Sequence, residues 1–465
     1  MIYAVVVATV AAVLFAVTVY RTLGVKNQAD FLVAGRTLRW PVLVFTLLSS
    51  WIGAGSLFAG AENAYLHGFA ALWQPAGGWV GLIVIFFIAG RARRFGQFTV
   101  PDLLEARYNP AARVMATIAI VISYTMITSY QFKAGGDILH LIFPSVDRLT
   151  GMCWIAGLVI VFTAAAGMAS IAYLDLIIGG MVTVIVLFAV PVVIHGAGGW
   201  SGVKAALPET HFQVFGSLTP AQALGYMMPT LLLLVGNQGM YQKFFSASSE
   251  KDARNAVVGW IVGTLLLETL LVTLAVAGSA RFHVPNPREI IPYTAREGLP
   301  AWAGALLLGG IFAKVISTAN NYLFSPATNL IHDVYARFIH KRASERASLI
   351  ASRVIVVLLG VFALLQATQF ESILAASLYA YTVYGAAVTP VVLAVFFWRR
   401  ATTAGAVSSI VLGTATTVAW RLMGYDLDYA VYPALGISLI GLIGGSLVTK
   451  PPEESKWRPF FTKAE

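Results

Sequence analysis

One lysine lies deep in a long apolar segment, close to two hydroxyl side chains. Lys314 precedes Ser317 by three residues and Thr318 by four, so the three side chains share one face of a helix. Lys314 is thirteen residues into the apolar segment 301–334, about 20 Å along a helix. An ammonium group in hydrocarbon costs about 2.5–3.5 kcal/mol even on a mild insertion scale, so a function is expected of it. The ammonium could occupy a cation site itself, or it could lose a proton.

Two carboxylates also lie in apolar surroundings. Asp175 opens the segment 171–195, and Glu268 lies in the middle of the segment 253–281. Either carboxylate could pair with Lys314 for structural reasons only. Asp175 could also complement a helix N-terminus, and Glu268 could contact a substrate amine or carry a proton. The residues alone leave these alternatives open.

Two apolar segments contain residues that interrupt a helix. The segment 40–61 contains Gly53, Gly55 and Ser56, and the segment 219–243 contains Pro229, Gly236, Asn237, Gln238 and Gly239. Glycine and proline both weaken a helix interior. Interrupted helices at matching places in two halves of a chain indicate an inverted-repeat transporter with a binding site near the middle of the membrane. The alternative is that these residues serve helix packing only.

The composition excludes most soluble functions. The chain has 465 residues, of which 58% are hydrophobic and 11% are charged, whereas a soluble protein is roughly 25% charged. A soluble enzyme, a disordered protein and a nucleic-acid-binding protein are therefore excluded. The single Cys153 offers neither a disulfide nor a thiolate metal site. The sequence has no P-loop for ATP and no set of nucleophile, base and oxyanion donors, so we expect a secondary transporter and not an enzyme.

We expect an all-α polytopic membrane protein with about 13 transmembrane helices. Each apolar segment of roughly 20 residues can cross a hydrocarbon layer about 30 Å thick. Of the 31 lysines and arginines, 23 fall in one set of loops and 7 in the other. Because basic loops stay in the cytoplasm, the N-terminus is expected outside and the C-terminus in the cytoplasm of a cell (inner or plasma) membrane. The predicted helices are 2–20, 40–61, 70–90, 111–132, 151–168, 171–195, 219–243, 253–281, 301–334, 348–367, 371–398, 404–421 and 430–449.

Five segments, in order along the chain, resemble motifs of the sodium:solute symporter family, which includes bacterial sodium/proline, sodium/sialic acid and sodium/galactose transporters. They are Asp30–Arg36 (DFLVAGR), Thr99–Tyr108 (TVPDLLEARY), Tyr241–Lys243 followed by Ala253–Arg254, Ser317–Asn320 followed by Asp333–Tyr335, and Pro390 followed by Phe397–Arg400 and Gly405–Ala406. The resemblance implies the LeuT-type fold, with two inverted five-helix repeats and two broken helices. A single transporter domain, 1–465, would then comprise an extra N-terminal helix (1–20), two repeats (40–195 and 219–398), two C-terminal helices (404–449) and a cytoplasmic tail (450–465).

The resemblance also implies a sodium site between the first broken helix and the segment 301–334. The family supplies backbone carbonyls at the positions of Ser49, Ile52 and Lys314, and hydroxyls at those of Ser317 and Thr318. Unwound backbone frees such carbonyls to face a cation. Asp175 partially matches a family segment near the sodium pathway.

Sodium is therefore the expected coupling ion, and no other cofactor is expected. Lys314 opposes this expectation, as does Asn320, which stands where the family usually has aspartate. The alternatives are a proton-coupled or sodium-independent transporter in which Lys314 occupies the cation site, and a membrane sensor that binds a solute without moving it.

The expected substrate is a small organic solute, a carboxylate or an amino acid in preference to a sugar. The helix ends freed at a break face polar or anionic groups, and small or apolar residues stand where the family's galactose transporters carry larger polar ones. Alternating access would carry this solute across the bilayer. The predicted substrate-binding residues are Trp51, Gly53, Gly55, Ser56, Thr230, Leu233, Glu268, Tyr381 and Thr382.

Overall fold

The computed structural model describes residues 2–22, 33–95, 99–165, 168–339 and 345–461. Asp30, Phe31 and Leu32 of the first family-like motif lie outside these ranges, as do residues 166–167 of one predicted helix and the last four residues of the tail. Within the described ranges the regular elements are helices, and the one β-type contact is an isolated bridge between Leu38 and Ala247. The expectation of an all-α protein is confirmed.

The helices of the first half follow the predicted segments closely. They are α1 (Ile2–Thr22), α3 (Trp40–Trp51), α4 (Gly60–His67), α5 (Trp73–Phe95), α6 (Val100–Arg107), α7 (Pro110–Ile142), α8 (Arg148–Ala165), α9 (Met168–Gly196) and α10 (Gly199–Ala206). Side-chain caps fix several starts. Asn109 accepts a hydrogen bond from the Ala112 amide at 3.1 Å, and Pro110 occupies the first turn of α7, as expected for a helix N-terminus.

The second half has the same character. Its helices are α11 (Pro220–Gly236), α12 (Gln238–Ser246), α13 (Glu250–Ser279), α14 (Ile290–Glu297), α15 (Ala301–Asn329), α16 (Glu345–Ala367), α17 (Ile373–Ala387), α18 (Thr389–Phe397), α19 (Thr403–Leu422), α20 (Val431–Val448) and α21 (Glu454–Phe461). A π-helical segment, η6 (Leu330–Ile339), extends α15. The predicted segment 371–398 is divided at Val388 into α17 and α18, since Pro390 in the first turn of α18 cannot donate a backbone hydrogen bond.

Both helices that were predicted to be interrupted are broken. The helix α3 ends at Trp51, Ile52 has extended backbone (φ −83°, ψ 98°), and a π-helical segment, η2 (Gly55–Ala59), leads into α4. In the second broken helix, Asn237 (φ −56°, ψ 111°) separates α11 from α12, and its side chain caps α12 by accepting from the Met240 amide at 3.2 Å. Each break thus exposes polar backbone inside the bundle, where a ligand can use it.

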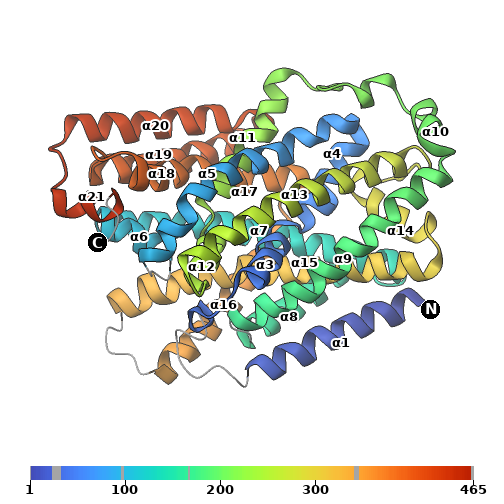
Figure 1. Cartoon of the computed structure of the whole chain (residues 1–465), viewed down its shortest axis with the longest axis horizontal. Helices are drawn as coiled ribbons and strands as arrows, with labels where there is room; N and C mark the ends of the chain where they lie inside the picture. The colour runs from blue at the N-terminus through green and yellow to red at the C-terminus, as the bar shows by residue number, and fades with distance from the viewer. Residues whose placement is uncertain (1, 23–32, 96–98, 166–167, 340–344, 462–465) are drawn as a thin grey trace.

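The helices form one elongated bundle with the two chain ends at opposite ends (Figure 1). The N-terminal end carries α10 and α14, and the C-terminal end carries α6 and α21. Ten helical stretches of the described chain are long and apolar enough to cross a membrane, and two shorter apolar helices cover Ile2–Val17 and Trp40–Trp51. A polytopic membrane protein is confirmed, whereas the count of thirteen helices stays a prediction.

Candidate functional site

A fully buried carboxylate collects hydrogen bonds from two other helices. Asp175 lies on α9 and accepts from Thr46 Oγ1 of α3 at 2.6 Å. On the other side, the Ser317 hydroxyl of α15 donates to Asp175 Oδ1, and Asn321 Nδ2 lies 3.5 Å from Asp175 Oδ2. Three helices are therefore joined through one carboxylate, because a buried charge needs hydrogen bonds to replace its lost hydration.

Two buried ammonium groups lie beside this carboxylate. Lys314 Nζ donates to Ser49 Oγ at 2.9 Å. Lys243 Nζ of α12 donates to Ser50 Oγ at 2.5 Å and to Asn321 Oδ1 at 2.8 Å. Both lysines are at most 1% exposed.

Asp175 is the charged group that interacts electrostatically with each lysine. The result is a buried group with two cations and one carboxylate. We call it the Asp175 cluster: Thr46, Ser49, Ser50, Asp175, Lys243, Lys314, Ser317, Thr318 and Asn321.

The predicted cation-site residues come together in this cluster, with Ile52 at its edge. The Thr318 hydroxyl donates to the Ser49 carbonyl at 3.3 Å, and Ile52 is the fully buried first residue of the break. Gly53, predicted to bind substrate, instead faces Thr318, since a Cβ at Gly53 would lie 2.6 Å from Thr318 Oγ1. The structure brings these residues together, and their role in binding sodium stays a prediction.

A second site, the Glu268 pocket, opens beside the same break. Its free space is about 20 Å³, room for about one water molecule. Glu268 Oε1 accepts from Ser56 Oγ at 2.8 Å, and Glu268 is only 5% exposed. Six predicted substrate residues line the pocket together with four that were not predicted: Trp51, Gly55, Ser56, Thr230, Glu268 and Tyr381, with Gly60, Gln74, Pro75 and Val272.

The remaining predicted substrate residues lie away from this lining. Leu233 and Thr382 are fully buried and do not border the pocket. Glu268 and Lys314 form no ion pair in the described part of the chain, since Lys314 Nζ donates to Ser49 Oγ and Glu268 Oε1 accepts from Ser56 Oγ. Within the described part of the chain, Glu268 is therefore a buried carboxylate without a cationic partner.

Sequence reasoning missed five polar residues of these sites, which are Thr46, Ser50, Lys243 and Asn321 in the Asp175 cluster and Gln74 in the Glu268 pocket. Lys243 is the last residue of the predicted helix 219–243, yet its side chain is buried inside the bundle. Its place in the Tyr241–Lys243 motif was the available signal. Gln74 is 5% exposed, and its Oε1 has no hydrogen-bond partner in the described structure. Gln74 lies near the start of a predicted apolar segment, where a polar residue does not by itself indicate a binding site.

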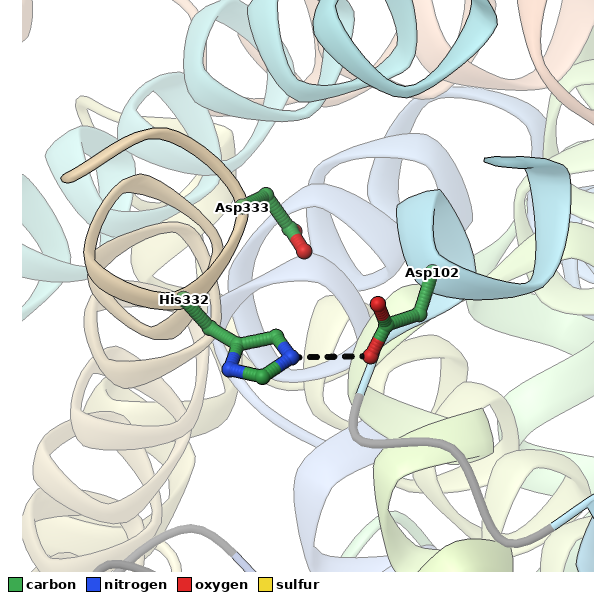
Figure 2. A group of neighbouring side chains, drawn as sticks. All are labelled: Asp102, His332 and Asp333. Carbon is green, nitrogen blue, oxygen red and sulfur yellow. Dashed lines mark hydrogen bonds and ion pairs between the residues drawn. The ribbon is translucent and has the colours of Figure 1, made fainter. Parts of the chain in front are cut away.

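A separate cluster lies near the end of the bundle that carries α6. His332 Nε2 lies 3.0 Å from Asp102 Oδ2, with Asp333 alongside (Figure 2). The three side chains are close enough together to hold a metal ion. However, the guanidinium of Arg113 already contacts Asp102, Glu105 at 2.6 Å and Asp333 at 3.4 Å. Arg113 therefore supplies the positive charge that a metal would, and the cluster is an ion-pair network that ties α6, α7 and η6 together.

Comparison of the sequence with models of known families shows to which family this chain belongs. The model of the sodium:solute symporter family matches residues 31–413, a stretch that contains both broken helices, the Asp175 cluster and the Glu268 pocket. The chain belongs to the sodium:solute symporter family. This family consists of transporters, so the chain is a membrane transporter of small solutes and not an enzyme.

Individual relatives agree with this family. The high-affinity proline transporter of Bacillus subtilis is 24% identical over 455 residues, covering 92% of this chain and 94% of the relative. The sodium/proline symporter of Haemophilus influenzae is 26% identical over 482 residues, covering 95% and 93%. Among solved structures, a substrate-bound, outward-open Na⁺-coupled sialic acid symporter superposes with a TM-score of 0.84, at 16% identity, over 97% of this chain and 98% of the other. The LeuT-type fold expected for the sodium:solute symporter family is confirmed.

Proposed function

We propose that this member of the sodium:solute symporter family transports a small solute that carries a protonated amine, and that the Glu268 pocket binds it. The observation that carries the proposal is the uncompensated carboxylate of Glu268 beside the break in α3 and η2. A buried ionisable residue inside a membrane protein marks a functional site by default. An ammonium group on the solute would supply the missing charge partner.

The rest of the pocket fits an ammonium group. Gln74 Oε1 is a second acceptor without a partner in the described structure. Trp51 and Tyr381 add aromatic rings, and a cation is attracted to such rings. A solute bearing only a carboxylate would be repelled by Glu268, so an amino acid or another amine fits better than a simple organic acid. The proline transport named for the two relatives supports the same class of solute.

Uptake into proteoliposomes tests this proposal. The panel comprises proline, other amino acids, amines without a carboxylate, monocarboxylates and sugars. We expect uptake of an amine-bearing member. We expect Glu268→Gln to weaken its binding roughly 10- to 150-fold, because a hydrogen bond to a charged group contributes about 1.5–3 kcal/mol. Glu209→Gln, at an exposed position, is the matched control. Uptake confined to monocarboxylates or sugars would refute the proposal.

The coupling ion has two candidates. Family membership favours sodium, brought to the oxygens of Ser49, Ser317 and Thr318. The position of Lys314 Nζ, 2.9 Å from Ser49 Oγ, favours the second candidate, a proton-coupled or sodium-independent transporter.

We also propose that the N-terminus lies outside and the C-terminus in the cytoplasm, which is supported by the basic loops and by the positions of the two ends.

A further inference from the structure

The sodium site implied by the family can be tested against the charges that surround it. Among the described residues, Asp175 is the one carboxylate that acts on the two ammonium groups of Lys243 and Lys314. The helices that meet here are α3, α9, α12 and α15, and α3 contributes only hydroxyl side chains, such as Ser49 and Ser50. The Asp175 cluster thus carries one positive charge more than it can neutralise. A sodium ion would add a second excess charge to a site that is closed to water.

The positions of the lysines show which of them conflicts with sodium. Lys243 lies on α12, and its ammonium is held by Ser50 and Asn321, neither of which is among the implied sodium ligands. Lys314 lies on α15, and its ammonium is held by Ser49, whose carbonyl is one of the implied sodium ligands. That carbonyl also accepts from Thr318, whose hydroxyl is another implied ligand. Two of the implied sodium ligands, the Ser49 carbonyl and the Thr318 hydroxyl, are therefore bonded to each other and lie beside the fixed ammonium of Lys314.

We propose that the Lys314 ammonium is a resident cation that stands in place of sodium, so that this protein binds no sodium at the Asp175 cluster and transports without it. Lys243 neutralises Asp175, and Lys314 links α15 to α3 as an ion bound between them would. The link is covalently anchored to α15, so it neither leaves nor follows a gradient. Only the second part of the inference, transport without sodium, rests on the proposed function. The first part, the absence of sodium binding, can be measured without a solute.

Thermal melting of the purified full-length protein tests the inference. The probe is sodium chloride, compared with the chloride of N-methylglucamine at equal ionic strength. We expect no sodium-specific shift for the native protein or for Lys314→Arg, which keeps the charge. Lys314→Ala removes the ammonium, leaves the oxygens in place, and is expected to gain a saturable, sodium-specific rise in melting temperature. Lys204→Ala, on the exposed face of α10, is the control.

The outcomes separate the inference from the proposed function. Saturable stabilisation of the native protein by sodium, or binding of ²²Na⁺ to it, would overturn the inference even if Lys314→Ala did not fold. A folded Lys314→Ala protein that ignores sodium would also overturn it, because the lysine would then not occupy a sodium place. If solute uptake fails but the melting results are as expected, the proposal about the solute is refuted and the inference about Lys314 is not.

Discussion

Replacing Asp175 by asparagine should leave the buried ammonium groups of Lys243 and Lys314 without a counter-charge. The change keeps the size of the side chain but removes the one carboxylate that acts on Lys243 and Lys314. Two unit charges about 4 Å apart attract each other by roughly 4 kcal/mol at an effective dielectric constant of about 20. This is an upper bound for each lysine, since neither forms an ion pair with Asp175 in the described structure. Removing one partner from a buried charge pair costs about 3–5 kcal/mol. We therefore expect Asp175→Asn to lower the free energy of unfolding by about that amount.

A second substitution identifies the cause of this loss. In the Asp175→Asn background, Lys314→Met removes one stranded ammonium and should recover about 2–3 kcal/mol. In the native background, the same Lys314→Met leaves Lys243 and Asp175 as a balanced pair and should change stability by less than about 1 kcal/mol. Thr46→Val deletes the 2.6 Å hydrogen bond to Asp175 without changing any charge. Its cost, about 1.5–3 kcal/mol, should not be recovered by Lys314→Met.

Unfolding by SDS in mixed micelles, followed by tryptophan fluorescence, measures these free energies. The reasoning predicts a coupling between the two positions, since Lys314→Met is nearly neutral in one background and stabilising in the other. Additive effects, within about 0.5 kcal/mol, would mean that the groups do not interact. Additivity would refute the charge balance described for the Asp175 cluster.

Three further predictions concern other parts of the molecule. Gly55→Leu should abolish solute binding and leave expression intact, because a Cβ there would lie 2.5 Å from Tyr381 Oη, whereas Gly157→Ala, which meets nothing within 4 Å, should bind normally in the same radioligand assay. Arg113→Ala should lower the melting temperature well beyond Arg337→Ala, because Arg113 is 6% exposed among three carboxylates and Arg337 is 55% exposed beside one. A reporter fused after Glu465 should be active only in the cytoplasm, and periplasmic activity would contradict the charge distribution.

The long apolar helices and the breaks in two of them could be predicted from the sequence. The glycines of the segment 40–61 and the residue Asn237 marked both breaks, because helix-weakening residues stand out in an otherwise apolar run. Short helices outside the predicted spans, such as α10 and α14, went unpredicted. Each has only eight residues, too few for helical periodicity to be recognised against loop composition.

The site was only partly readable, because contacts between helices are not encoded by spacing along one helix. Lys314, Ser317 and Thr318 were recognised together since they share one face of α15. That Asp175 and not Glu268 faces Lys314 depends on how α9 and α13 pack, and no pattern within either segment carries that information. The role of Lys243 was missed for the same reason, since its partners Ser50 and Asn321 come from two helices that are distant in the sequence.

The narrowness of the Glu268 pocket affects how strongly any solute can bind. With about 20 Å³ free and the hydroxyls of Tyr130 and Tyr381 3.3 Å apart, a solute can bind only in a different, wider conformation. Apparent affinity falls in proportion to the population of that competent state, by tenfold for each 1.4 kcal/mol or so needed to reach it. Substitutions that loosen the tyrosine contact would therefore tighten binding of every solute that fits, and would weaken discrimination by size.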